Sequence, residues 1–151
     1  MPNWIEGTLK IRGKESDVIA FIENGLKPCA GRYENDPDHF VHKIANDDYF
    51  IAVDTYVDNS RRMFVADYCE IFLWGDTNRI YYLPIKQAWG FDLDDFIYIS
   101  KTYNLDLRIT GFEGGIGFDQ EIEVINGEVT LDKSNHYDDY WWESPCPTLG
   151  G

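Results

Sequence analysis

The sequence lacks the long apolar runs and the N-terminal signals of membrane and secreted proteins. No uninterrupted apolar run reaches the ~18 residues that suggest a transmembrane helix. The first residues, MPNWIEGTLKIRG, have neither a basic start nor a continuous apolar core, so no signal peptide is expected. These absences predict a cytoplasmic protein without a membrane partner.

Cysteines are few and form no known pattern. Cys29, Cys69 and Cys146 are odd in number and far apart, and no CxxC pair occurs. This favours reduced thiols over a disulfide framework and argues against a cysteine-based zinc site. The pattern assigns no role to any of the three thiols.

Motifs of common enzyme classes are also absent. No serine stands in GxSxG, no cysteine has a neighbouring histidine, and no Walker A sequence occurs. The glycines of 114–117 lack the GxGxxG spacing and precede a predicted strand, so they do not indicate a dinucleotide site. We therefore predict that the protein is not an enzyme and needs no cofactor.

One cluster of metal-ligand residue types leaves an alternative open. His39 and His42 are three residues apart and could share a helical face, with Asp38 beside them. Such a set could serve a metal-dependent enzyme. The other interpretation is a polar surface turn.

Positive charge is scarce. The chain has 27 acidic and 13 basic side chains and a net charge of −14. Residues 109–151 hold 9 acidic groups and 1 basic group, Lys133, which gives −8. Such a field repels nucleic acid and anionic membranes and attracts cationic protein surfaces, although solubility alone is the other explanation.

Apolar periodicity predicts two helices among several strands in one domain, 1–151. Helices are predicted over 14–26 and 92–104, and residues 27–48 form a turn-rich loop or insertion. The first helix can be capped by Ser16 or Asp17 and stopped at Asn24–Gly25, and the second can be capped by Asp92 and stopped at Asn104. Strands are predicted over 4–13, 49–57, 70–74, 79–85, 105–112, 118–125 and 128–132.

Turn chemistry adds two local predictions. Asn126–Gly127 is the strongest short hairpin signal, because a type I′ turn needs two residues at positive φ. Pro84 lacks a backbone donor and is expected at a sheet edge or strand end. The order of elements predicts an α+β, ferredoxin-like fold: an antiparallel sheet with two helices on one face and a C-terminal β-hairpin.

Alternation in 118–132 gathers carboxylates on one face of the predicted sheet. Glu121, Glu123 and Glu128, with Asp119, are expected to face solvent as a charged surface. A catalytic acid/base pair would need one buried carboxyl with a raised pKa, which this pattern does not indicate. We predict that these four residues contact a partner.

The acidic–aromatic tail, about 133–151, is the second predicted partner surface. Tryptophan and tyrosine anchor interfaces, and acids around them add electrostatic steering. The alternative is that Trp141 or Trp142 closes the core of the domain, and residues 145–151 are expected to be loosely ordered. The predicted contact residues are Asp138, Asp139, Tyr140, Trp141 and Glu143.

Three segments together resemble the YubB ferredoxin-like family. They are MPNW at the start, YYLPIKQAWGF at 81–91, and EGGIGFDQEIEVINGEV at 113–129. The resemblance covers most of the chain and is weakest over 27–65. It implies a ferredoxin-like fold, a phage or plasmid origin in a bacterial host, and no established catalytic residues. The sequence has Ile5–Glu6 where many relatives have a cysteine after the tryptophan.

Charge and resemblance together lead to one main hypothesis. We expect an interaction or inhibitor protein of a mobile element that counters a host defence system, of anti-CRISPR or anti-restriction type. As a nucleic-acid mimic, it would dock on the basic surface of a nucleic-acid-guided nuclease or restriction enzyme and would not bind nucleic acid itself. The alternative is a nucleotide-binding module that uses the cleft between sheet and tail, with Arg79, Lys86 or Arg108 meeting phosphate.

Overall fold

The computed structural model describes residues 2–29, 41–44, 48–73, 75 and 79–151. Its helices are α1 (Glu15–Gly25), α2 (Leu93–Tyr103) and α3 (Tyr140–Glu143). The long strands are β1 (Trp4–Arg12), β8 (Ile80–Ala88), β9 (Asp106–Glu113), β10 (Phe118–Ile125) and β11 (Glu128–His136). The short strands are β2 (Leu26–Lys27), β3 (Val41–Lys43), β4 (Tyr49–Ile51), β5 (Tyr56–Val57), β6 (Met63–Val65) and β7 (Cys69–Ile71).

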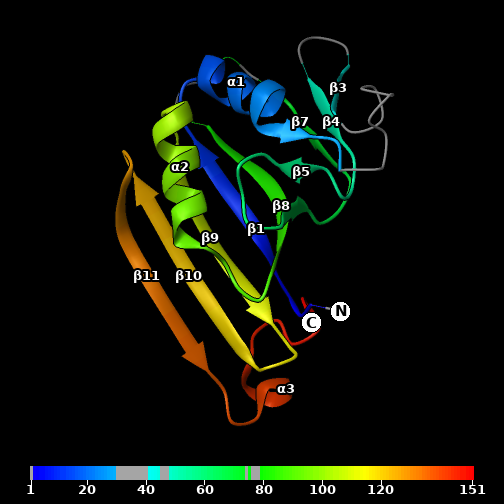
Figure 1. Ribbon diagram of the computed structural model, residues 1–151, viewed down its shortest axis with the longest axis vertical. Coiled ribbons are helices and arrows are strands. Elements are labelled where there is room, and N and C mark those ends of the chain that lie inside the picture. Colours follow the sequence, from blue (N-terminus) through cyan, green and yellow to red (C-terminus); the bar gives the residue numbers. More distant parts are fainter. Residues whose placement is uncertain (1, 30–40, 45–47, 74, 76–78) are drawn as a thin grey trace.

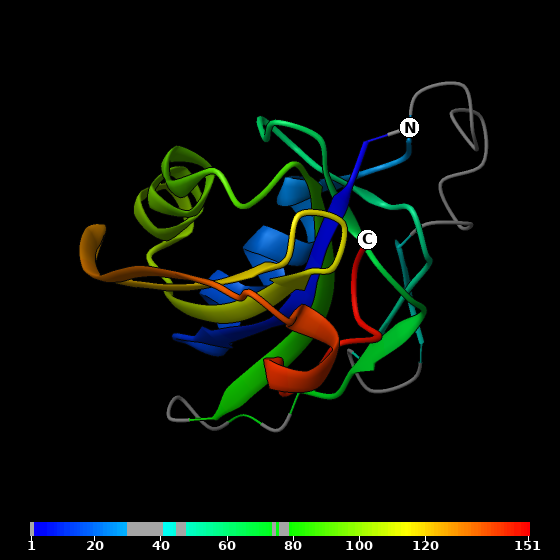
Figure 2. The same ribbon diagram turned by 90° about the horizontal axis from the view of Figure 1, so that it is seen from below.

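The architecture is α+β, with a large antiparallel sheet. Eight strands follow the order β11-β10-β9-β1-β8-β6-β5-β2, and β3, β4 and β7 form a separate three-stranded sheet. Strand β1 pairs antiparallel with both β8 and β9, so β8 and β9 run parallel on either side of it. Helices α1 and α2 both lie on one face of the large sheet (Figures 1 and 2).

The core lies between these helices and the sheet. Alternate residues of β1, such as Leu9 and Ile11, are buried under Phe21 of α1 and Phe96 of α2. Burying each such side chain contributes roughly 1.5–3 kcal/mol. The intervening residues of β1, β8, β9 and β10 point to the opposite face, which we call the open face.

The second helix forms for the predicted reasons. The Asp92 carboxylate accepts a hydrogen bond from the Asp94 N–H at 3.1 Å, and Asn104 ends the helix with φ 55°. The predicted ends of the first helix are wrong. Its N-cap is Lys14, which makes no side-chain capping bond, and Gly25 stays helical because the chain passes directly into β2.

Two strand predictions need correction. The single strand over 49–57 is two strands, β4 and β5, separated by a turn in which Asp54 has φ 64°. Pro84 lies inside β8 and not at its end: it pairs with Thr8 of β1, whereas the pairing with β6 stops at Val65 and Ile85, which leaves Pro84 at a local edge on that side. Its carbonyl accepts from the Ala66 N–H at 2.9 Å, so its nitrogen faces the same side, where β6 has already ended and no donor is needed.

The C-terminal residues are held in place, so the expectation of loose order is wrong. The Gly151 N–H donates to the Trp4 carbonyl at 2.7 Å, and the Trp4 N–H donates to the Gly151 carbonyl at 3.3 Å. The chain therefore closes beside its own first strand, as Figure 1 shows for the two ends.

Candidate functional site

The predicted acidic face is interrupted by its own contacts. Asp119 is buried, and its carboxylate accepts hydrogen bonds from the Tyr137 hydroxyl at 2.5 Å and the Asn135 side chain at 2.8 Å. The bond to Asp119 raises the pKa of Tyr137 to about 12. The expectation that Asp119 faces solvent is therefore wrong: this carboxylate fixes β11 and the tail to β10.

The remaining acids of that face are partly neutralised. Glu123 accepts from the Thr130 hydroxyl at 2.7 Å and forms an ion pair with Arg108 at 2.7 Å, and both contacts lower its pKa. Glu121 is half-buried and lies opposite Lys133 in the β10–β11 register, whereas Glu128 is exposed. The ion pair between Glu123 and Arg108 weakens the case for a continuous acidic docking face.

The acidic–aromatic tail is arranged differently from either expectation. Tyr140 is buried and packs on the glycine backbone of the β9–β10 loop, at Gly114 and Gly117. Trp141 and Trp142 are 70% and 86% exposed, so the alternative in which one of them closes the core is wrong. Tyr140 closes the core there, and helix α3 holds both indoles in solvent.

The acids of the tail flank these tryptophans in the sequence. Asp138, Asp139 and Glu143 are exposed. The Glu143 carboxylate accepts from the Asp139 N–H at 2.8 Å, which orders the start of α3. No ion pair neutralises the three acids within the described part of the chain.

A third exposed tryptophan, Trp89, was not predicted as a contact residue. Trp89 directly follows β8, has φ 59°, and is 58% exposed. A positive φ is rare for a bulky residue and costs of order 1–3 kcal/mol. Burial does not explain this conformation, because the indole points to solvent.

The neighbouring loop stacks a cation against this indole. Arg62 also has a positive φ, 52°, and its guanidinium lies 5.2 Å from the ring centroid of Trp89 and 5.7 Å from that of Trp4. The Lys86 ammonium lies 5.3 Å from the Trp4 ring and pairs with Asp54 at 2.7 Å. Each such cation–π contact contributes about 0.5–1 kcal/mol at exposed sites.

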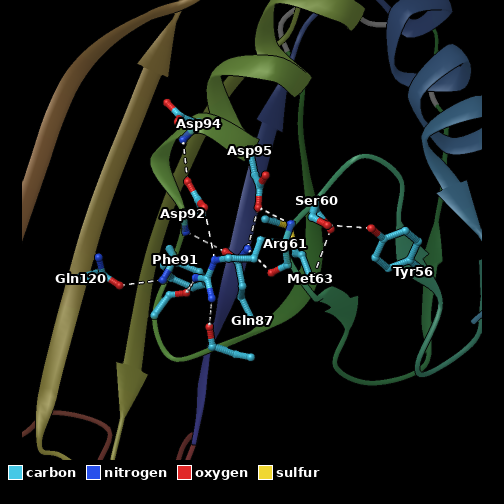
Figure 3. Close-up of polar contacts among 12 residues, drawn as sticks. Tyr56, Ser60, Arg61, Met63, Gln87, Phe91, Asp92, Asp94, Asp95 and Gln120 are labelled. Carbon is cyan, nitrogen blue, oxygen red and sulfur yellow. Dashed lines mark hydrogen bonds and ion pairs between the residues drawn. The ribbon is translucent and has the colours of Figure 1, made fainter. Parts of the chain in front are cut away.

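Arg61 clamps the backbone on both sides of Trp89 (Figure 3). Its guanidinium donates to the Ala88 carbonyl at 2.9 Å and to the Gly90 carbonyl at 2.9 Å. It also pairs with Asp92 at 3.2 Å. One planar group thus fixes the carbonyl groups of the two residues that flank Trp89.

Two buried polar side chains hold the clamp. The Gln87 amide donates to the Asp95 carboxylate at 2.6 Å and to the Arg61 carbonyl at 2.7 Å, and its oxygen accepts from the Asp92 N–H at 2.9 Å. The same Asp95 oxygen accepts from the Arg61 N–H at 2.9 Å. Burial raises the pKa of Asp95 despite these bonds.

Asp95 therefore gives a pH-dependent prediction. The pKa of Asp95 in the folded protein lies above its unfolded value of about 3.9, so folding takes up a proton at a pH between the two values. The free energy of unfolding therefore falls as the pH rises from the unfolded pKa through the folded pKa. Asp95→Asn should remove this fall, because an amide does not titrate, and should keep the fold, because the amide oxygen can still accept both bonds. Asp95→Ala should cost roughly 1–3 kcal/mol, because one N–H of the buried Gln87 amide and the Arg61 backbone N–H lose their acceptor. Urea unfolding across acidic pH measures both, and an unchanged slope in Asp95→Asn would contradict the assignment.

Trp89 and the pair Trp141 and Trp142 lie at the same end of the large sheet. Trp4 starts β1 and pairs in register with Ala88, the residue before Trp89. Helix α3 lies at this same end (Figure 1), and Ile116 of the adjoining β9–β10 loop is 67% exposed. We call this surface the tryptophan end; its members are Trp4, Trp89, Ile116, Trp141 and Trp142.

The glycine-rich loop at 114–117 is not a phosphate cradle. The buried carboxylate of Glu113 accepts from the Gly115 N–H at 2.7 Å and the Ile116 N–H at 2.8 Å. These are the amides that an anion would otherwise use, so the loop is a tight bend satisfied by its own side chain.

The metal prediction falls largely outside the described residues. Asp38 and His39 are outside the described residues. For His42 only the backbone is described, and it pairs with Phe50 in the small sheet. Among the described residues no group of three possible ligands gathers. Of the predicted phosphate-binding residues, Lys86 and Arg108 are ion-paired, and Arg79 is exposed.

No protein-family model, curated protein or solved structure matches this chain. In the described residues, no helix combines the length and apolarity that a membrane crossing needs.

Proposed function

We propose that this protein is an interaction protein that binds a basic protein surface through the tryptophan end. The observation that carries the proposal is the exposure of Trp89, Trp141 and Trp142 on a rigid framework, beside acids that form no ion pair with the described residues. Large exposed apolar groups mark interaction sites, and tryptophan is enriched among residues that dominate binding energy. A net charge of −14 favours a cationic partner.

The partner class follows from the resemblance noted in the sequence. We propose a ferredoxin-like protein of a mobile element that docks on the nucleic-acid-binding surface of a host defence protein, where carboxylates replace phosphates. The parallel strands β8 and β9, joined through α2 and separated by β1, support the fold because they form a split β-α-β unit. The sheet acids Glu121, Glu123 and Glu128 become secondary contacts.

A capture experiment with matched variants tests this function. Immobilised protein is exposed to nuclease-treated bacterial extract, and the proteins that it binds are compared with those bound by two variants. The tail variant is Asp138→Asn/Asp139→Asn/Glu143→Gln, and the sheet variant is Glu121→Gln/Glu128→Gln. The specific partner should be lost with the tail variant, retained by the sheet variant, and displaced by salt and by nucleic acid. Affinity that does not change with salt would contradict the proposal.

Trp89 gives a test that separates binding from folding. Trp89→Gly should leave stability unchanged or higher, because relief of the positive φ offsets the loss of about 0.5–1 kcal/mol of stacking. Trp89→Ala keeps the strain and should be about 1 kcal/mol less stable than Trp89→Gly. Both should bind the partner at least roughly thirtyfold more weakly. Urea unfolding and calorimetry measure these effects, and a glycine variant less stable than the alanine variant would contradict the account.

A further inference from the structure

The open face of the large sheet contains a cationic groove between β1, β9 and the C-terminal segment. Its volume is about 290 Å³, near the lower limit of ~300–1,000 Å³ for small-molecule sites. Lys10 and Arg108 line it, and no acidic residue does. In a chain with a net charge of −14, this local excess of positive charge needs an explanation.

The two cations lie directly opposite each other. Lys10 of β1 is the register partner of Arg108 of β9. Like charges in this position destabilise a sheet, so stability does not account for the pair. Arg108 is partly neutralised by Glu123, but no carboxylate pairs with Lys10 within the described ranges.

The rest of the lining determines which anion fits. Cross-strand partners have Cβ atoms roughly 5 Å apart, so both cationic groups can reach one phosphate. Hydroxyl groups of Thr8 and Thr110 lie along the same groove, and Phe112 and Leu149 give it an apolar wall. We propose that this groove binds a phosphate monoester that carries a ring, of the nucleoside monophosphate class.

This site is independent of the proposed docking function. It needs no protein partner, and its residues do not belong to the tryptophan end. Cys146 also lines the groove and is exposed, so its thiol reports on occupancy. Cys69 interferes little, because burial and the nearby Asp67 raise its pKa to about 12.

The test uses adenosine 5′-monophosphate, inorganic phosphate and adenosine as probes. Alkylation of Cys146 by N-ethylmaleimide is followed by peptide mass spectrometry, which separates it from Cys29, and affinity is measured by calorimetry. Adenosine 5′-monophosphate should protect Cys146 more than phosphate does, and adenosine should not protect it. Equal protection by adenosine, or none by the monophosphate, would overturn the proposal.

Lys10→Gln provides the decisive variant. It should weaken binding of adenosine 5′-monophosphate at least about tenfold, because one charged donor is lost. Its melting temperature should not fall, since the like-charge contact is removed. Lys27→Gln, which changes an exposed lysine on the far edge strand β2, should bind as the wild type does. Unchanged binding in Lys10→Gln would sink the assignment.

Discussion

Replacing Trp141 and Trp142 together by alanine is expected to weaken partner binding by more than about a hundredfold while leaving the fold intact. Both indoles are almost wholly in solvent, at 70% and 86% exposure, so their removal creates no cavity. Exposed substitutions of this kind usually change stability by about 0.5 kcal/mol or less. Tryptophans at the centre of an interface each contribute about 2 kcal/mol or more to affinity. Calorimetry with the captured partner and urea unfolding measure the two quantities.

Two controls separate this prediction from a general effect of aromatic removal. Tyr68→Ala/Phe72→Ala removes side chains that are 59% and 46% exposed but lie outside the tryptophan end, and binding should be unchanged. Tyr140→Ala should instead lower stability by about 3–5 kcal/mol, because it empties a buried position. Equal loss of binding in the first control would show that the contact is unspecific.

Gly7→Ala is expected to cost at least about 3 kcal/mol of unfolding free energy. A Cβ at this position would lie 2.2 Å from the Thr110 carbonyl oxygen and 2.9 Å from the Gly111 Cα. Both atoms are backbone of β9, so the central pair of strands must move apart. Overpacking of a well-packed site typically costs about 1–3 kcal/mol and more where backbone blocks relief.

The matched control is Gly114→Ala in the β9–β10 loop. Its Cβ would meet the Tyr140 ring at 3.4 Å, which is an ordinary contact. We expect a change below about 1 kcal/mol for this variant. Similar urea midpoints for the two alanine variants would show that strands β1 and β9 can separate, and would contradict the close packing described here.

The elements with strong local signals could be predicted from sequence. Asp92 and Asn104 bound α2 because a carboxylate cap and a left-handed residue act within a few positions of the chain. Asn126 and Gly127 both have positive φ and turn β10 into β11, as the hairpin signal requires. The turn at Asp54 gives no comparable signal, since apolar residues continue on both sides of it.

The candidate site was less accessible to sequence reasoning. Alternation places Glu123 on the correct face but cannot name Arg108 as its partner, because only the β9–β10 register brings them together. Asp119 is buried by Tyr137 and Asn135, which arrive from β11 and the tail. The prominence of Trp89 depends on Arg61, which lies far from it in sequence and clamps the flanking carbonyls. The sequence pointed to Trp141 through the acidic residues around it, whereas Trp89 stood only within the YYLPIKQAWGF segment before the second helix.

Footprinting of the captured complex tests the central claim most directly. Side-chain labelling by short-lived radicals, read by mass spectrometry, compares the free protein with the bound protein. The account predicts that binding protects Trp89, Trp141 and Trp142 and leaves Tyr82, 55% exposed on the open face, as reactive as before. Protection of Tyr82 with no change at the three tryptophans would contradict it.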